Sequence, residues 1–175
     1  MELPKRKNPR LKEYDYNSPG AYFITVCTHS RESILSNIVG EIHESPENKL
    51  TNAGKIVEET IMQLPDRFNI AIDKYVIMPN HIHLLLQVKE DERAIHESPL
   101  QNGRSIVSKV IGYLKMNSSK RIHAIDDENK IWQRSFHDHI IRDKYDYEKI
   151  WEYIDTNVLR WELDCFYNDK TEKSL

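Results

Sequence analysis

Hydrophobic residues recur along this chain at two spacings, one typical of strands and one typical of helices. Runs rich in β-branched, aromatic and aliphatic residues predict four strands, over 22–28, 69–78, 81–88 and 135–141. Stripes at helical spacing predict three helices: one from Thr51 or Asn52 to Leu64, one from Ser105 through Met116, and one that begins near Asp143.

The order of these elements is strand, helix, strand, strand, helix, strand, helix. It predicts an α+β sandwich in which helices pack on one face of a four-stranded antiparallel sheet. Residues 1–18 are expected to form a basic irregular arm, residues 19–163 the folded domain, and residues 164–175 a tail. Residues 30–50 are mixed in character and are compatible with a short hairpin of 34–35 with 38–42, followed by a loop over 43–48.

The most informative stretch is Met78-Pro79-Asn80-His81-Ile82-His83, at the junction of two predicted strands. Pro-Asn is a turn signal, and the two histidines that follow share one face of the next strand because side chains alternate along a strand. Both imidazoles can therefore point at one small object in front of the sheet, and a metal ion is the obvious one. A zinc site would need more than two ligands. Without further support, a surface pair or a hydrogen-bonded pair is the more common role of such histidines.

The last predicted helix carries a second group of polar residues. At 100° per residue its core stripe consists of Tyr147, Ile150, Trp151, Ile154, Val158 and Trp161. Tyr153 and Asn157 lie on the flank of this stripe, one above the other at i, i+4, and Lys149 lies one turn earlier on the same row. We expect these three side chains at the edge of a buried face, directed along the sheet surface.

Together the two groups have a specific chemical meaning. A phenol is a poor nucleophile, but metal coordination of a phosphate oxygen and in-line placement lower the barrier to its attack by roughly several kcal/mol. His81, His83 and the amide oxygen of Asn157 would make a weakly held site with open positions, suited to Mg²⁺ or Mn²⁺. Without the histidine pair, Tyr153 would be interpreted as a surface aromatic residue and Asn157 as a helix C-terminal residue.

Composition sets the outer bounds. The 175 residues are 39% hydrophobic, enough for one domain with a core. No apolar run approaches the ~20 residues that span a bilayer, and no apolar signal segment follows the basic start, so we expect a cytoplasmic protein. Cys27 lies in an apolar strand pattern, so it and Cys165 are expected to be free thiols.

The net charge of −3 gives no global argument for nucleic acid binding, but the basic residues are unevenly distributed. They cluster in the N-terminal arm and along the second predicted helix, at Lys5, Arg6, Lys7, Arg10, Lys109, Lys115, Lys120 and Arg121. With Lys149, these residues are candidates for phosphate contacts on single-stranded or hairpin DNA. Two ordinary solvated charge clusters are an equally good interpretation of composition alone.

Several motifs in order resemble the single-tyrosine HUH transposases, and most closely the REP-associated tyrosine transposases. The resemblance covers roughly residues 10 to 163. Its motifs are Tyr-Val-Ile-Met-Pro-Asn-His-Ile-His at 75–83, Trp132-Gln133-Arg134 with Phe136, Asp138-His139-Ile140-Ile141-Arg142, Tyr153-Ile154 with Asn157, Gly54–Glu59 and Leu64–Phe68.

This resemblance implies a ferredoxin-like HUH endonuclease domain that cleaves and rejoins single-stranded DNA with Mg²⁺ or Mn²⁺. Tyr153 would be the nucleophile that forms a 5′-phosphotyrosine, and His81, His83 and Asn157 would be the metal ligands. The chain departs from the family where Val158 follows Asn157 in place of the usual proline. A second His-x-His, His137 and His139, is interpreted as structural or DNA-contacting.

Two other functions are compatible with the sequence. One is a domesticated, catalytically idle protein that binds DNA hairpins, although the intact histidines and tyrosine argue against it. The other is a phosphoesterase that uses the histidine pair and a metal but not the tyrosine. The sequence does not determine the DNA target, nor whether Tyr153 serves its own chain's metal site or that of a partner in a homodimer.

Overall fold

A four-stranded antiparallel sheet forms the centre of the domain in the computed structural model, which describes residues 18–40, 46–90, 105–125 and 130–167. Its strands are β1 (Gly20–Cys27), β4 (Ile70–Met78), β5 (His81–Val88) and β6 (His137–Ile141), in the order β4-β5-β1-β6. The central strands are thus the first and third of the sheet in chain order, which is the ferredoxin-like arrangement. The predicted α+β class and the four predicted strands are confirmed.

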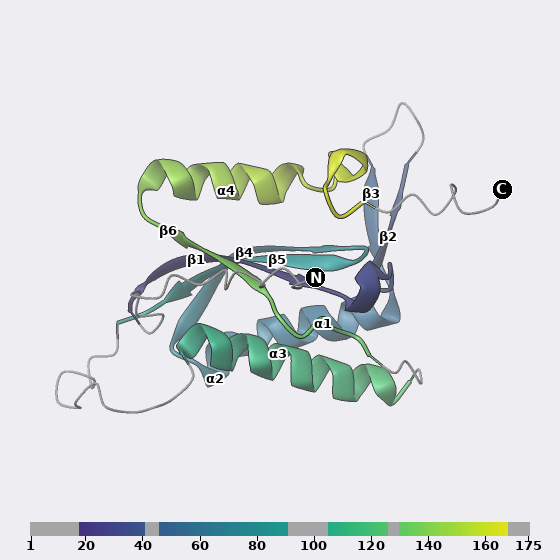
Figure 1. Cartoon of the computed structure of the whole chain (residues 1–175), viewed down its shortest axis with the longest axis horizontal. Helices are drawn as coiled ribbons and strands as arrows, with labels where there is room; N and C mark the ends of the chain where they lie inside the picture. Colours follow the sequence, from purple (N-terminus) through teal and green to yellow (C-terminus); the bar gives the residue numbers. More distant parts are fainter. Residues whose placement is uncertain (1–17, 41–45, 91–104, 126–129, 168–175) are drawn as a thin grey trace, which may run out of the picture.

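Helices cover both faces of this sheet (Figure 1). Helices α1 (Asn52–Met62), α2 (Leu64–Arg67) and α3 (Ile106–His123) lie on one side, and α4 (Lys144–Thr156) lies on the other. The prediction that the helices share one face was therefore wrong. The reason is Leu85, which lies on the histidine face of β5, is fully buried and packs with Ile150 and Ile154 of α4.

Alternation along β5 divides its side chains between two cores. Ile82, Leu84 and Leu86 are fully buried in the larger core, under α1 and α3, together with Tyr22 and Ile24 of β1. The opposite face carries His81, His83 and Leu85 beneath α4 and the chain that follows it. Because both faces are covered, seven of the eight β5 residues are buried, among them the two histidines.

Side-chain caps begin the three long helices. The Oγ1 atom of Thr51 accepts a hydrogen bond from the Gly54 amide at 3.1 Å, and Asp143 Oδ1 accepts one from the Asp146 amide at 2.8 Å. Ser105 caps α3 in the same way. These bonds satisfy amide groups that have no partner within the helix. None of the helices in the described part of the chain has the length and apolar character needed to cross a bilayer.

The region between β1 and α1 differs from the predicted hairpin. Strands β2 (Ser36–Val39) and β3 (Glu47–Leu50) pair with Ser36 opposite Leu50, so the returning strand lies beyond 38–42. Part of the predicted segment, 41–45, lies outside the described residues. The amide of Asn48 donates a hydrogen bond to the carbonyl of Ile77 at 2.8 Å, which ties β3 to the end of β4.

The end of α4 also differs from the predicted stripe. The helix ends at Thr156, and Trp161–Leu163 form a separate 3-10 turn, η3. Trp151, expected in the core, is 38% exposed, and the Lys74 ammonium lies 4.1 Å from the centre of its ring. The buried row of the helix is Ile150 and Ile154, and Asn157 continues it directly after the helix.

Candidate active site

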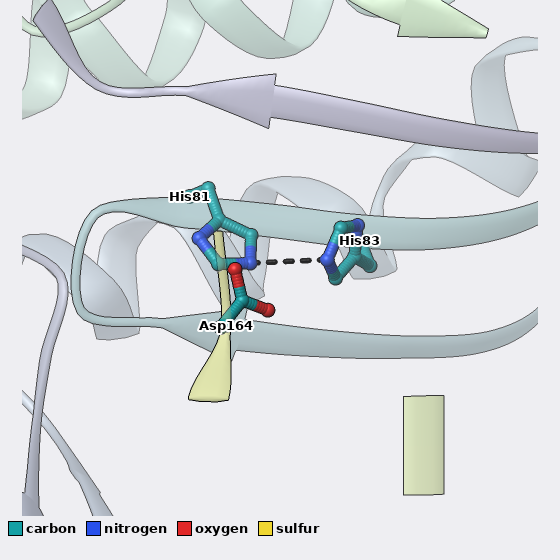
Figure 2. A group of neighbouring side chains, drawn as sticks. All are labelled: His81, His83 and Asp164. Atoms are coloured by element: carbon teal, nitrogen blue, oxygen red, sulfur yellow. Dashed lines mark hydrogen bonds between the residues drawn. The ribbon is translucent and has the colours of Figure 1, made fainter. Parts of the chain in front are cut away.

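The histidine pair lies at the end of β5 that follows the Pro-Asn turn (Figure 2). His81 is fully buried and His83 is 1% exposed. Their Nε2 atoms approach each other to 3.0 Å, and the ring centres are 4.5 Å apart. Two ligand atoms about 2.1 Å from one ion, at a right angle to each other, are about 3.0 Å apart. The spacing of the two nitrogens therefore fits a shared divalent ion.

Neighbouring side chains fix both rings. The Asn80 amide nitrogen donates to the carbonyls of Phe166 (2.7 Å) and Arg31 (3.3 Å), so its oxygen faces His81 Nδ1 at 2.9 Å. Since that oxygen only accepts, we assign the proton of His81 to Nδ1, which leaves the Nε2 lone pair facing the site. Thr25 Oγ1 lies 2.9 Å from His83 Nδ1 and fixes the second ring. Since His81 Nε2 has no proton, the hydrogen bond between the two Nε2 atoms places the proton of the metal-free His83 on its Nε2, and the threonine hydroxyl donates to Nδ1. Such partners orient metal-binding histidines in general.

Burial keeps the two imidazoles uncharged. It lowers the pKa of His81 to about 4 and that of His83 well below its ordinary value, to which the proximity of His81 also contributes. Neutral imidazole is the form that binds a metal ion, so the pair is ready for one at neutral pH.

Tyr153 of α4 reaches the histidines of its own chain. Its hydroxyl oxygen lies 3.3 Å from His83 Nε2 and donates a hydrogen bond to Asp164 Oδ2 at 3.3 Å. The side chain is 37% exposed, so one side of it is open to a substrate. Burial of the remainder, followed by the negative charge of Asp164, raises the pKa of Tyr153 to about 12. The phenol therefore holds its proton at neutral pH.

Asn157 lies at the same place with an oxygen that has no partner. The residue is 2% exposed, its Nδ2 donates to Asp164 Oδ2 at 3.4 Å, and among the described residues nothing bonds its Oδ1. A buried amide oxygen without a partner is costly, and a metal ion would satisfy it. This orphaned oxygen is the observation that favours Asn157 as a ligand.

Asp164 is a site residue that the sequence motifs did not indicate. Its carboxylate and the ring nitrogens of the two histidines offer ligand atoms that all lie within 4.8 Å of one another (Figure 2). No sequence signal marks this role, because Asp164 is one of 28 acidic residues and lies in the predicted tail. With the two nitrogens and the amide oxygen of Asn157, it forms a mixed N/O donor set of the kind that Mg²⁺ and Mn²⁺ accept.

Residues directly after Asp164 lie against the site. The Phe166 amide donates to Asp164 Oδ1 at 2.7 Å, and the Phe166 ring centre lies 4.6 Å from that of His81. An Arg31 Nη1 donates to the Cys165 carbonyl at 3.3 Å. The beginning of the predicted tail thus contributes to the walls of the site.

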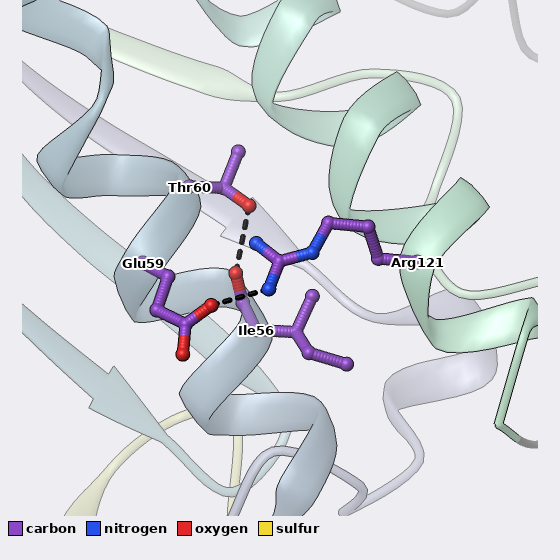
Figure 3. Close-up of polar contacts among 4 residues, drawn as sticks. All are labelled: Ile56, Glu59, Thr60 and Arg121. Carbon is purple, nitrogen blue, oxygen red and sulfur yellow. Dashed lines mark hydrogen bonds and ion pairs between the residues drawn. The ribbon is translucent and has the colours of Figure 1, made fainter.

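The basic residues proposed for DNA contact that the structure describes have different surroundings. Lys115 is half-buried, its ammonium donates to the carbonyls of Gln133 (2.9 Å) and Ser135 (2.8 Å), and burial lowers its pKa to about 8. We therefore assign Lys115 a structural role in place of the predicted phosphate contact. Arg121 forms an ion pair with Glu59 of α1 (Figure 3).

The remaining candidates differ in their position relative to the site. Lys109 and Lys120 are exposed on α3, across the sheet from the histidines, whereas Lys149 is exposed on α4, on the histidine side. Lys5, Arg6, Lys7 and Arg10 lie outside the described residues.

The second His-x-His and the other two tyrosines of α4 have different surroundings. His139 is exposed and its Nε2 lies 2.7 Å from Asp146, which agrees with a structural role. Tyr147 donates its hydroxyl proton to Asp73, and Tyr145 is 70% exposed. Of the three tyrosines of α4, Tyr153 is the one that lies in hydrogen-bonding range of the histidine pair.

Comparison with known proteins agrees with the fold and the motifs. Residues 18–157 match the family described as Transposase IS200 like. An uncharacterised protein of Haemophilus influenzae is 32% identical over 174 residues, which are 94% of each chain. Another protein of that organism, named as a REP-associated tyrosine transposase, is 28% identical over 169 residues, which are 89% of this chain and 84% of the relative.

A solved structure of a REP-associated tyrosine transposase bound to a REP hairpin has the same fold. It superposes with a TM-score of 0.59 at 21% identity and covers 86% of this chain and 74% of its own. The resemblance found in the sequence motifs is thereby confirmed. The family match covers most of the chain, and the protein therefore belongs to the IS200-like transposases.

Proposed function

We propose that this protein is a metal-dependent enzyme that cleaves and rejoins single-stranded DNA next to hairpins. The observation that carries the proposal is the convergence of a tyrosine hydroxyl, two neutral imidazoles and an orphaned amide oxygen in one partly open site. The substrate class is supported by the family and by the REP hairpin in the related structure.

In the proposed reaction the Tyr153 oxygen attacks the phosphorus of a phosphodiester. The bond from phosphorus to the 3′ oxygen breaks, which leaves a 5′-phosphotyrosine and, after protonation of the leaving oxygen by water, a free 3′-OH. Asp164 Oδ2, which already accepts the Tyr153 hydrogen bond, receives the phenol proton. Attack by the 3′-OH of another strand on the phosphotyrosine reverses these steps and rejoins DNA.

The ligands proposed for Mg²⁺ or Mn²⁺ are His81, His83 and Asn157, with Asp164 as an additional carboxylate. When bound, the ion would supply a positive charge that polarises a phosphate oxygen. The chain's own contribution is positioning: Asn80 and Thr25 hold the imidazoles, and α4 presents Tyr153. A site organised before the substrate arrives lowers the barrier because little reorganisation remains.

Binding of the DNA backbone is proposed to use exposed lysines, chiefly Lys109, Lys120 and Lys149, together with the N-terminal arm. Each phosphate contact releases counterions, so the affinity should fall steeply with salt. The proximity of Tyr153 to the histidines of the same chain supports cleavage within one chain, without a partner's tyrosine.

The test is adduct formation on a denaturing gel. The wild-type protein, Tyr153→Phe and the matched control Tyr145→Phe are incubated with Mn²⁺ and labelled single-stranded hairpins from the DNA that flanks its own gene. We expect a covalent adduct with the wild type and with Tyr145→Phe, and none with Tyr153→Phe. Tight hairpin binding without any adduct would favour the idle DNA-binding protein, and cleavage that persists in Tyr153→Phe would favour the phosphoesterase.

A further inference from the structure

A cleft beside the active site is not used by the proposed reaction. It has a volume of about 640 Å³ and lies between the β2–β3 hairpin and the residues that follow α4. Ile38 and Pro46 line the hairpin side, and Leu159, Trp161 and Tyr167 line the other side. Figure 1 shows η3 next to β2 and β3. We call this space the η3 cleft.

Trp161 connects the η3 cleft to the metal site. Its ring lines the cleft, and the ring centre lies 6.0 Å from that of His81. The ring of Tyr167 meets it edge-on, with centres 5.4 Å apart, which holds the indole in place. Trp161 therefore lies between the η3 cleft and the place where the scissile phosphate would bind.

The chemistry of the lining favours a nucleotide as occupant. The cleft has two aromatic rings, a partly apolar wall and the exposed residue Arg160. Proteins that bind single strands generally stack bases on aromatic rings and place cations near the phosphates. Glu162 also lines the cleft, and its carboxylate can accept from an exocyclic amino group of a base. The volume lies in the range of small-molecule sites, so one base with its sugar fits.

We propose that the η3 cleft binds the base of a nucleotide adjacent to the scissile phosphate, with the base stacked on Trp161. This inference rests on the proposed function, because it takes the scissile phosphate to lie at the histidine pair. The cleft would fix the register of the single strand, so that one phosphodiester and not its neighbour lies in front of Tyr153.

The experiment is an abasic scan of the bound strand. A hairpin from the flanking DNA with a single-stranded extension is prepared in a series in which each extension nucleotide in turn is abasic, and affinities are measured for the full-length protein. Trp161→Leu, which keeps apolar bulk but removes the flat ring, should weaken binding of the intact strand by roughly 5- to 150-fold. With the wild-type protein, loss of the base at one extension position should weaken binding by a similar factor. With Trp161→Leu, loss of the same base should cause no further loss of affinity.

Two further variants keep the result interpretable. Trp161→Phe retains an aromatic face and should recover most of the affinity, which would not follow if the residue only packed. Trp151→Leu removes an exposed tryptophan of α4 outside the η3 cleft and should leave the abasic scan unchanged. Thermal unfolding of each variant reports whether the fold is intact.

Adduct formation on the same strands separates the two proposals. If the adduct forms but no abasic position depends on Trp161, or if the two changes are additive, the η3 cleft is not a base site while the proposed function stands. If neither binding nor an adduct is found on any flanking hairpin, both proposals are wrong.

Discussion

Removing the hydroxyl of Thr25 tests the organisation of the metal site without touching a ligand. Thr25 is 6% exposed, and its Oγ1 lies 2.9 Å from His83 Nδ1. In Thr25→Val the side chain keeps its shape, but the buried nitrogen loses its partner. In the metal-free protein this nitrogen accepts the threonine proton. With an ion on Nε2 it must donate instead, and the ion's charge strengthens that bond.

The loss therefore weakens the metal-bound state more than the free state. Partners of this kind contribute about 10- to 100-fold to metal affinity, so Thr25→Val should bind Mn²⁺ that much more weakly. Titration calorimetry with Mn²⁺ at neutral pH measures the change. Thr60→Val is the matched control, because Thr60 is also buried, but its hydroxyl donates only to the Ile56 carbonyl of its own helix, at 2.7 Å (Figure 3).

Equal Mn²⁺ affinities for Thr25→Val and Thr60→Val, with both variants folded, would refute this reasoning. The ion would then have to bind without His83, or the ring would be held by packing alone. Phe23 stacks on the His83 ring with centres 5.0 Å apart, so a Phe23→Leu variant would identify the second cause.

Three other predictions concern stability and binding. In the metal-free protein, His81 and His83 take up protons between about pH 6.5 and pH 4 in the unfolded chain but not in the folded chain. The free energy of unfolding should therefore fall, as the pH drops through this window, by up to about 1.4 kcal/mol per pH unit for each histidine. Chemical unfolding at a series of pH values should show this slope, and a His81→Gln/His83→Gln variant should lose it. Leu85→Ala, which opens the contact between β5 and α4, should cost about 2–5 kcal/mol in denaturant unfolding, whereas Leu163→Ala, at an 86% exposed position, should change little; equal effects would contradict the described packing. Lys149→Glu and Lys120→Glu should each weaken hairpin binding and reduce the slope of log affinity against log salt concentration by about one. Lys115→Met should reduce stability and leave this slope unchanged, and a reduced slope in Lys115→Met would show that Lys115 does contact DNA.

The fold could be predicted from the sequence largely because β-strand signals were strong. Strand β5 runs over the predicted residues, and Thr51, Ser105 and Asp143 begin helices as expected. The position of α4 could not be predicted in this way. Leu85 lies on the same face as the histidines, and a single apolar side chain does not indicate by sequence that a helix covers that face.

The site was predictable only in part. The i, i+4 spacing of Tyr153 and Asn157 and the His-x-His spacing of the histidine pair indicated four residues, and these do lie together in the candidate site. Asp164 and Trp161 could not be predicted, because both positions depend on the chain turning back toward β5 after Thr156, where the predicted helix continued. Asn80 was interpreted as a turn residue, and its buried amide, which orients His81, depends on contacts with the distant residues Arg31 and Phe166.

Covalent attachment of Tyr153 to DNA is the central claim. The most direct test is to digest the protein after incubation with Mn²⁺ and a cleaved hairpin strand, and to locate the attached nucleotide by mass spectrometry. We predict a nucleotide joined through a 5′ phosphate to the peptide that carries Tyr153, and an equal amount of product with a free 3′-OH. Cleaved DNA with a free 5′ phosphate and no modified peptide, or attachment at another tyrosine, would contradict the claim.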